Sequence, residues 1–168
     1  MMKKIKYCNI LAYVMLIALI LVVSPFVVPK IFGYEPYGIL SNSMEPDYPV
    51  GSVVYVKSQS PESIMKGDVI TFKTSVVNDS VATHRVMIND AKKRSFVTKG
   101  DHNDDVDATA VAYERLLGKV VLCVPMLGNI YLWLVSMFGV ATCTFTLIMV
   151  ITLWLHVAKW KKELGIKK

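Results

Sequence analysis

The stretch Val81-Ala82-Thr83-His84-Arg85-Val86-Met87-Ile88 is the longest of five short runs of β-branched and aromatic residues in the middle of the chain. Such runs are typical of β-strands, because branched and aromatic side chains pack well on a pleated surface. The other four runs are residues 53–56, 69–72, 96–98 and 120–124. Five strands this close together predict a mainly β domain, built as a small antiparallel, partly closed sheet.

Turn signals rich in glycine, asparagine, aspartate and proline separate the runs. They are Pro49-Val50-Gly51, Lys66-Gly67-Asp68, Val77-Asn78-Asp79-Ser80, Asn89-Asp90 and Lys99-Gly100-Asp101. Residues 61–65 predict one helical turn in addition. We place the β domain at residues 30–127.

An apolar segment precedes the β domain and follows three lysines. Residues 10–23 are apolar without interruption, and residues 26–28 extend the run to a length that spans a bilayer. A cleavable signal peptide has the same basic start and apolar core, but it ends in a small-x-small pattern that is missing here. We therefore predict a cytoplasmic tail and a retained N-terminal transmembrane anchor at residues 1–29.

A second apolar segment follows the β domain. Residues 130–155 contain no acidic or basic side chain, and the segment is long enough to cross a membrane with some tilt. Tyr131 and Trp133 at one end, with Trp154 and Trp160 at the other, are typical of interfacial aromatic belts. We predict a C-terminal transmembrane helix at residues 128–158 and a basic cytoplasmic tail at 159–168.

Positive charge is concentrated outside the β domain. The two tails hold eight lysines and one glutamate, whereas the region between them holds 11 basic and 12 acidic residues. Cations that flank apolar segments indicate cytoplasmic tails, so the β domain is expected on the extracytoplasmic face of a cell membrane, or of the endoplasmic reticulum membrane in a eukaryote. The net charge of +6 therefore predicts a lipid bilayer as a partner and no nucleic acid.

A stiff polar loop, Ser41-Asn42-Ser43-Met44-Glu45-Pro46, lies between the first apolar segment and the predicted strands. Pro46 and Pro49 restrict the residues before them to extended geometry. Such a loop can hold a hydroxyl in one place, although serines in loops usually satisfy the backbone of a turn. Because a serine becomes a nucleophile only next to a base, the loop alone leaves both interpretations open.

His84 is the first candidate for that base. Period-two alternation places it on the same strand face as Ala82, Val86 and Ile88. An apolar face keeps a histidine neutral, which is the form that a general base needs. A core histidine with satisfied nitrogens is the alternative, and a carboxylate that orients the ring would favour the base.

Four carboxylates follow Gly100, at Asp101, Asp104, Asp105 and Asp107. They are interpreted as a solvated loop, as a calcium loop or as the source of an orienting acid. Val106 and Ala112 stand where an EF-hand needs its glycine and its closing glutamate, which argues against calcium. The cysteines and histidines have no zinc spacing, so the sequence predicts neither a metal nor a cofactor.

In this order, the serine loop, the histidine and the acidic loop resemble a type I signal peptidase (peptidase family S26). The matching motifs are Ser41-Asn42-Ser43-Met44-Glu45-Pro46, Gly67-Asp68-Val69-Ile70, Thr83-His84-Arg85-Val86, Thr98-Lys99-Gly100-Asp101-His102-Asn103 and Val124-Pro125-Met126-Leu127-Gly128. The resemblance is to the subgroup of the endoplasmic reticulum, archaea and some Gram-positive bacteria, in which histidine replaces the usual lysine base. Asn42 departs from the glycine that is common there, and His102 from a smaller or amide residue.

The resemblance implies a membrane-bound serine endopeptidase that removes signal peptides from preproteins by cleavage after small residues. It implies Ser43 as the nucleophile and His84 as the general base, with an oxyanion hole formed by the Ser41 hydroxyl and the Ser43 N–H. Asp107 is the preferred orienting acid, because the family's second essential acid commonly lies six positions after the Gly-Asp acid. Asp101 is then a structural or supporting residue of the site.

A preprotein must be extended to reach the serine, so pairing with an exposed strand edge is the expected binding mode. Residues 50–54, which include Val53, or the strand that bears His84 are the predicted edge. Met44 faces the substrate or the membrane, or only packs. Subunits of a secretion machinery are further expected partners.

Two other interpretations stay open. A non-catalytic, membrane-anchored β module could bind exported chains or assemble a secretion complex, but it would not need the serine, the histidine and the acids together. An enzyme with a lysine base would use Lys99 or Lys73, and an exposed lysine is charged at neutral pH and cannot accept a proton.

Overall fold

The computed structural model describes residues 2–75 and 80–165. The expected turn Val77-Asn78-Asp79-Ser80 therefore lies almost wholly outside the described residues. The chain divides into two compact units, one of residues 28–132 and one that combines residues up to 27 with residues from 133 onward.

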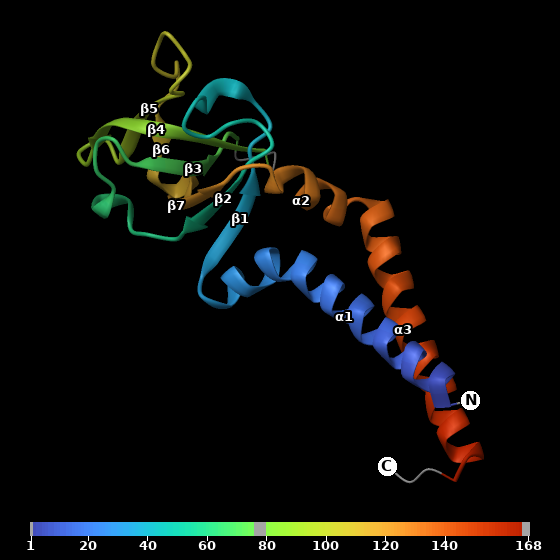
Figure 1. Ribbon diagram of the computed structural model, residues 1–168. Helices are drawn as coiled ribbons and strands as arrows, with labels where there is room; N and C mark the ends of the chain where they lie inside the picture. The colour runs from blue at the N-terminus through green and yellow to red at the C-terminus, as the bar shows by residue number, and fades with distance from the viewer. Residues whose placement is uncertain (1, 76–79, 166–168) are drawn as a thin grey trace. The chain divides into compact units, whose positions relative to one another are not determined.

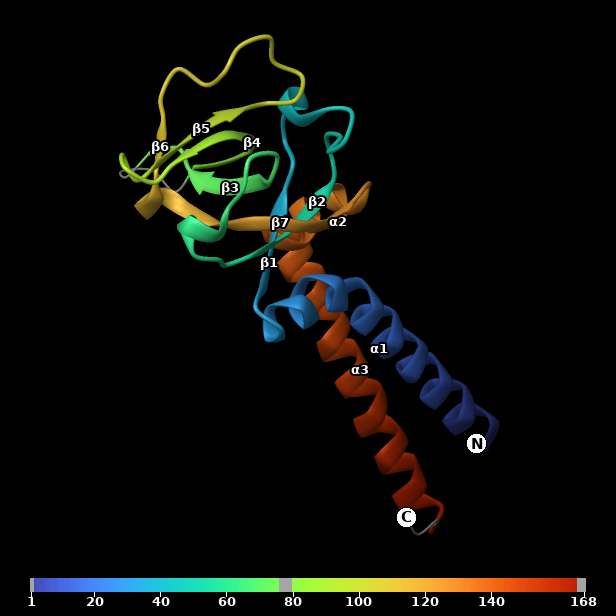
Figure 2. The same ribbon diagram turned by 90° about the vertical axis from the view of Figure 1, so that its left-hand side faces the viewer.

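The first unit is built on a curled antiparallel sheet (Figures 1 and 2). Its strands are β1 (Tyr34–Gly38), β2 (Val53–Lys57), β3 (Val69–Lys73), β4 (Val81–Asp90), β5 (Ser95–Lys99), β6 (Val111–Ala112) and β7 (Leu116–Val124). The strand order is β1-β2-β7-β3-β4-β5-β6, and the described pairs are all antiparallel. The predicted mainly β fold is confirmed.

Two strands were not predicted, and each has a local reason. β1 reads Tyr-Glu-Pro-Tyr-Gly, and its proline and glycine are signals against a strand interior. β1 is an edge strand, which is where proline is tolerated. β6 has only two residues, too few for any pattern. Three 3-10 turns complete the unit: η1 (Asn42–Met44), η2 (Pro61–Ser63), which was expected as a helical turn, and η3 (Tyr113–Arg115).

The core of this unit lies on both faces of β3. Ile70 and Phe72 belong to a buried cluster with Val86 and Phe96, whereas Val69 belongs to a second cluster with Ile39, Met44, Val54, Val56 and Val120. Adjacent residues of one strand point to opposite faces, so the curl of the sheet covers both. This explains why residues 69–72 are all buried, without the alternation of a strand that has one solvent-exposed face.

A β-bulge in β4 reverses the alternation after His84. Val86 is opposite Thr98 and Ile88 is opposite Val97, so β4 carries one extra residue, Met87. Ile88 is consequently 56% exposed. The prediction that Ile88 shares the face of His84 is wrong, because the bulge turns Ile88 outward.

Asn89 takes the inward place that the bulge creates. Its amide donates hydrogen bonds to the carbonyl oxygens of Pro61 at 2.9 Å and Ile64 at 2.8 Å. The Tyr113 hydroxyl donates to the same side chain. The bulge therefore ties η2 and η3 to β4 while leaving His84 in regular strand geometry.

The described residues also form the helices α1 (Met2–Ile31), α2 (Leu127–Val135) and α3 (Met137–Glu163), which are not part of the sheet. α1 and α3 are long and apolar enough to cross a membrane, judged by length and composition. The sequence predicts one helix over 128–158, but the structure has a break at Ser136. The Ser136 hydroxyl donates to the Trp133 carbonyl and accepts from the Gly139 N–H, which caps α3.

Candidate active site

Ser43 lies in η1, on the loop between β1 and β2, and a second loop fixes its backbone. The His102 N–H donates to the Ser43 carbonyl oxygen at 2.9 Å. A Cβ added to Gly100 would stand 2.6 Å from that oxygen and 2.7 Å from the Asn103 side chain. Glycine is therefore required at position 100 for the acidic loop to approach the serine loop this closely.

Met44 anchors the serine loop from the other side. Its side chain is only 1% exposed and packs in the second core cluster. Glu45 has the extended geometry (φ −70°, ψ 150°) that a residue before proline favours. The Ser43 hydroxyl is thus carried on a loop held at its backbone and at the next side chain.

His84 lies between Ser43 and Asp107. Its Nε2 is 3.3 Å from the Ser43 Oγ, and its Nδ1 is 2.6 Å from the Asp107 Oδ2. The ring also packs edge-on against Phe72, with the ring centroids 6.1 Å apart. When Nδ1 donates to the carboxylate, Nε2 is left as the acceptor for the serine proton. The structure therefore brings together Ser43, His84 and Asp107.

Thr98 holds the Asp107 carboxylate in place. Its hydroxyl donates to the same Oδ2 at 2.6 Å, and its carbonyl oxygen accepts from the Asp107 N–H at 2.8 Å. Thr98 is wholly buried. Sequence reasoning missed this residue, although it begins the motif Thr98-Lys99-Gly100-Asp101. The available signal was a polar residue two positions after Phe96, on the same face of the strand.

Asp101 pairs with Arg85 instead of His84. The guanidinium donates from Nε to Asp101 Oδ1 at 2.7 Å and from Nη2 to Oδ2 at 2.6 Å, and from Nη1 to the Gly67 carbonyl at 2.9 Å. The hydrogen bonds to Asp101 raise the pKa of Arg85 above its usual range. Arg85 has the neighbouring position on β4, so its side chain lies on the face opposite His84.

Ser41 lies next to the nucleophile candidate, with its Oγ 3.2 Å from the Ser43 Oγ. Both hydroxyls face a hollow of about 160 Å³. Residues 37–41, 43 and 44 form one wall, and residues 81–84 of β4 form the other. The hollow is thus small and bordered by two extended segments.

One of these segments has an open edge. β4 pairs with β3 from Val81 onward, whereas its described ladder with β5 begins only at Arg85. Residues 81–84 therefore have backbone groups directed away from β3 that no strand in the described chain pairs. The strand bearing His84 thus has an open edge at these residues, and peptide binding there stays a prediction.

Of the alternative edge at residues 50–54, Val53 and Val54 belong to β2, which lies between β1 and β7 and is paired on both sides, so these two residues offer no open edge. Val53 is wholly buried and is not among the residues that line the hollow, whereas Met44 contributes to its wall. Of the two predicted substrate contacts, only Met44 is therefore placed beside the candidate site.

Tyr37 closes one side of the hollow as a neutral phenol. Its hydroxyl donates to the Glu35 carboxylate at 2.7 Å. Burial, together with this hydrogen bond, raises the pKa of Tyr37 above its usual range.

Lys99, one of the two candidate lysine bases, donates to the Asp104 carbonyl oxygen at 3.0 Å. The candidate base that the structure brings to Ser43 is the imidazole of His84.

Comparison with known proteins points to one family. The family described as signal peptidase, peptidase S26, matches residues 9–105, more than half of the chain. The match includes Ser43, His84 and Asp101 and ends two residues before Asp107.

Two curated relatives bear related names. Signal peptidase I W of Bacillus subtilis is 36% identical over 121 residues, which cover 64% of this chain and 61% of that protein. The signal peptidase complex catalytic subunit SEC11 of Zygosaccharomyces rouxii is 29% identical over 107 residues, or 57% and 63% of the two chains. The chain thus spans about three fifths of the length of either relative. By the extent of the family match, this chain belongs to the signal peptidases of peptidase family S26.

Proposed function

We propose that the chain is a membrane-bound serine endopeptidase that removes signal peptides from exported preproteins by cleavage after small residues. The observation that carries the proposal is the continuous contact from the Ser43 hydroxyl through the His84 ring to the Asp107 carboxylate. A serine is activated by an adjacent base that a third group orients. A module that only binds exported chains has no use for this arrangement.

In the proposed reaction, the Ser43 Oγ attacks the carbonyl carbon of the scissile peptide bond. His84 Nε2 accepts the serine proton and then gives it to the leaving amine, while Asp107 holds the Nδ1–H. Water, activated by His84, then hydrolyses the acyl-enzyme and restores the free serine. The distance of 3.3 Å between Nε2 and Oγ is suited to this role, because such contacts tighten in the substrate complex.

The Ser43 N–H and the Ser41 hydroxyl are the proposed oxyanion hole. Ser41 Oγ lies 3.2 Å from the attacking atom, close to where the tetrahedral oxyanion would form. Removing one such donor typically costs about 2.7 to 4 kcal/mol of transition-state stabilisation. Ser41 is therefore assigned to the transition state and Ser43 to both attack and stabilisation.

The substrate is proposed to bind as an added strand along the open edge of β4, at residues 81–84. The hollow beside Ser43 holds only about 160 Å³, which favours small side chains next to the cleaved bond. Met44 contributes to the wall of this hollow, whereas the buried Val53 is paired with Gly38, which lines it.

Asp107 is proposed as the triad acid and Asp101 as a positioning residue. Asp101 fixes Arg85, and the turn that follows Gly100 holds the Ser43 carbonyl through the His102 N–H. Asp101 therefore acts on the serine loop through the backbone of its own turn.

The proposed location is a membrane crossed by α1 and α3. Residues 30–127 would lie on the extracytoplasmic side. The N-terminal tail, which precedes the anchor within residues 1–29, and the C-terminal tail at 159–168 would lie in the cytoplasm. In a eukaryote this membrane would be that of the endoplasmic reticulum. The relative SEC11 is named as the catalytic subunit of a signal peptidase complex, which supports further secretion subunits as partners.

Cleavage of a preprotein by the full chain in detergent tests the proposal. Ser43→Ala is expected to lower kcat by about 10⁴-fold or more, because the nucleophile is lost. Ser63→Ala is the matched control, since its hydroxyl only donates to the Ser60 carbonyl in η2. Undiminished cleavage by Ser43→Ala would overturn the proposal. Tight preprotein binding without any cleavage by the unaltered chain would favour the non-catalytic module.

A further inference from the structure

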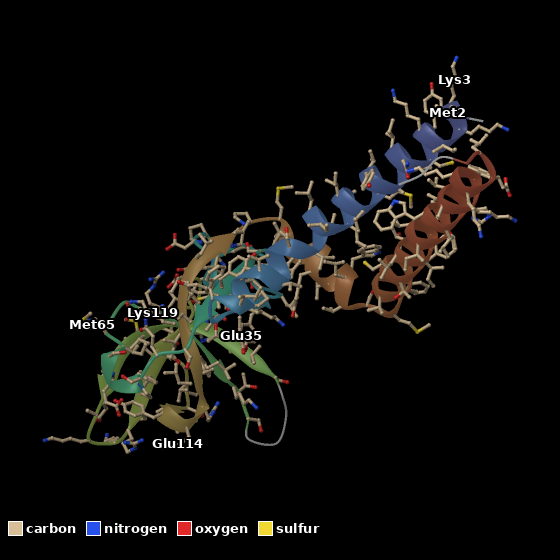
Figure 3. The ribbon with its side chains drawn as sticks, turned by 90° about the horizontal axis from the view of Figure 1, so that it is seen from below. Met2, Lys3, Glu35, Met65, Glu114 and Lys119 are labelled. Carbon is tan, nitrogen blue, oxygen red and sulfur yellow. The ribbon has the colours of Figure 1, made fainter. Side chains whose placement is uncertain are left out.

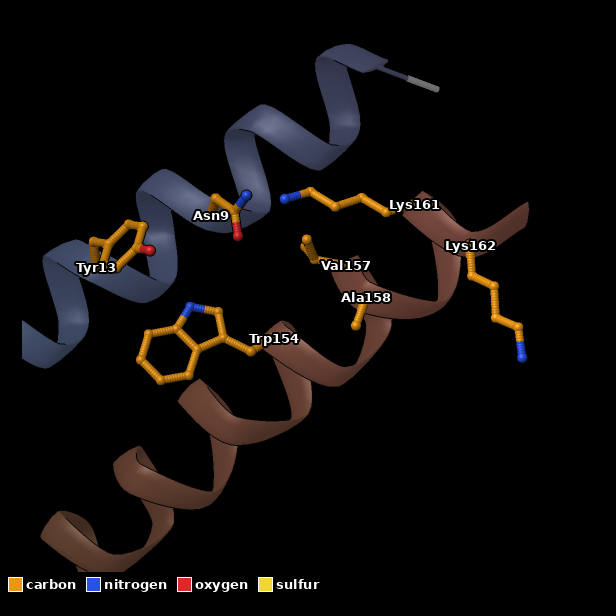
Figure 4. Close-up of a pocket in the computed structure, with 7 residues that line it drawn as sticks. All are labelled: Asn9, Tyr13, Trp154, Val157, Ala158, Lys161 and Lys162. Carbon is orange, nitrogen blue, oxygen red and sulfur yellow. The ribbon is translucent and has the colours of Figure 1, made fainter. Parts of the chain in front are cut away.

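α1 and α3 enclose a hollow at the end where α1 begins and α3 ends (Figure 4). Its volume is about 550 Å³. The lining comes from both helices: Asn9, Tyr13, Trp154, Val157, Ala158, Lys161 and Lys162. These residues belong to the unit that does not contain Ser43, His84 and Asp107, so the proposed peptidase reaction gives them no role.

The hollow is apolar at one end and cationic at the other. At the apolar end, the rings of Tyr13 and Trp154 meet edge to face, with their centroids 5.8 Å apart. Val157 forms a buried wall, with 4% of its surface exposed. At the other end, Lys161 extends from α3 toward α1 and its ammonium group ends beside Asn9 (Figure 4).

The two helices change character at the level of this hollow. On α1, Asn9 directly precedes the apolar run of residues 10–23, and on α3 the apolar run ends shortly before Lys159. If the helices span a membrane, the hollow lies where the acyl chains give way to the headgroups. Aromatic rings and lysines that extend toward water are typical of that level.

Positive charge surrounds the cationic end. α1 contributes Lys3, which Figure 3 shows at its beginning, together with Lys4 and Lys6. α3 contributes Lys159 in addition to the lysines of the lining, and Glu163 is the one carboxylate among the described residues of this helix end. The occupant of the hollow is therefore expected to carry negative charge.

We propose that this hollow binds one anionic phospholipid of the cytoplasmic leaflet. The headgroup phosphate lies at the Lys161 ammonium and the Asn9 amide, and the acyl chains lie against Tyr13 and Trp154. Basic pockets between transmembrane helices on the cytoplasmic side are known to hold anionic headgroups. A free phosphate would leave the aromatic end uncovered, so the two-part character of the hollow matches a lipid.

The experiment uses the full chain with Trp133→Phe and Trp160→Phe, which leaves Trp154 as its one indole. The protein is reconstituted in phosphatidylcholine vesicles that contain brominated phosphatidylglycerol or, at the same mole fraction, brominated phosphatidylcholine. Bromine quenches indole fluorescence on contact, so quenching reports which lipid occupies the aromatic end. We expect the anionic lipid to be preferred about fivefold, because a lysine near an anionic headgroup contributes about 1 kcal/mol.

Two variants separate a defined site from diffuse attraction. Lys161→Gln is expected to abolish the preference, whereas Lys159→Gln, which removes the same charge from the same helix end outside the lining, is expected to retain it. Equal quenching by the two lipids, or equal losses in the two variants, would overturn the proposal. Displacement of the brominated lipid by soluble glycerol phosphate would also overturn it, in favour of a phosphate site.

The measurement does not depend on peptidase activity. Ser43→Ala in the same background is expected to give unchanged quenching, so the lipid site and the proposed reaction can fail separately. A quenching pattern that changed with Ser43→Ala would contradict an independent lipid site.

Discussion

At the scale of single residues, one oxygen of Asp107 has two donors. Oδ2 accepts from the His84 ring at 2.6 Å and from the Thr98 hydroxyl at 2.6 Å. A carboxylate held by one bond can rotate about its side-chain torsions, whereas a second donor and a backbone hydrogen bond restrict that rotation. In the proposed reaction, Thr98 is therefore a positioning residue that acts on His84 through Asp107.

Thr98→Val is expected to lower kcat by about 10- to 100-fold with little change in KM, because a hydrogen bond to a charged group contributes about 1.5 to 3 kcal/mol. Steady-state cleavage of a preprotein measures this, and Thr98→Ser should restore most of the rate. Thr74→Val is the control, since the Thr74 hydroxyl donates to the Ser80 carbonyl oxygen and neither residue lines the hollow. Equal losses in the two valine variants would show a purely structural role.

The two candidate acids are expected to differ in kind. Asp107→Asn should lower kcat by about 10⁴-fold, because an amide cannot hold the Nδ1–H tautomer of His84. Asp101→Asn should mainly lower the free energy of unfolding, because it weakens the bidentate hydrogen bonding between Asp101 and Arg85. Cleavage rates and chemical unfolding of both variants make the comparison. Full activity in Asp107→Asn and none in Asp101→Asn would reverse the assignment.

At the scale of elements, the acidic loop that follows Gly100 and the serine loop are held together. They meet where the His102 N–H reaches the Ser43 carbonyl, and the absence of a side chain at Gly100 makes the approach possible. The bulge in β4 serves the same region from the other side, because it lets Asn89 secure η2 and η3 without disturbing the regular strand at His84.

Gly100→Ala is expected to lower activity far more than stability. Its Cβ would stand 2.6 Å from the Ser43 carbonyl oxygen, so the serine loop must shift and the nucleophile loses its alignment. A loss of about 100-fold in kcat/KM is expected from a shift of this order. Gly33→Ala is the control: its φ of +78° makes alanine strained, but nothing lies within 4 Å of the added Cβ. Comparable activity in both variants would contradict the prediction.

At the scale of the whole molecule, the sequence predicted the large features and missed the local ones. Apolar length and flanking lysines were enough to predict α1 and α3 as candidate spans, and β-branched runs predicted five strands. The bulge at Met87 and the break at Ser136 escaped, because backbone hydrogen bonds decide them and side-chain character does not. Only the family resemblance separated Asp107 from Asp101, because the partners of the two acids are distant in sequence and local pattern does not reveal them.

Alkaline solution is expected to destabilise the sheet unit through its tyrosines. Burial raises the pKa values of Tyr37, Tyr48 and Tyr55 above their usual range. Tyrosines in the unfolded chain ionise near pH 10, so above about pH 10 the unfolded state binds fewer protons and the free energy of unfolding falls as pH rises. Chemical unfolding between about pH 8 and 11 measures the slope.

Tyr37→Phe removes one of these ionisations and should make the alkaline slope shallower. It also removes the hydrogen bond to Glu35, so some loss of stability near neutral pH is expected as well. An unchanged slope in the variant would contradict the assignment of Tyr37 to this pH dependence.

The open edge of β4 is four residues long, from 81 to 84. A strand rises about 3.3 Å per residue, and alternate side chains point to the same face. A peptide paired with this edge therefore presents only about two side chains to the same face of the sheet. Contacts with two side chains admit a very large number of peptide sequences. Selection among exported chains then depends more on which chains are delivered to the edge than on their side chains.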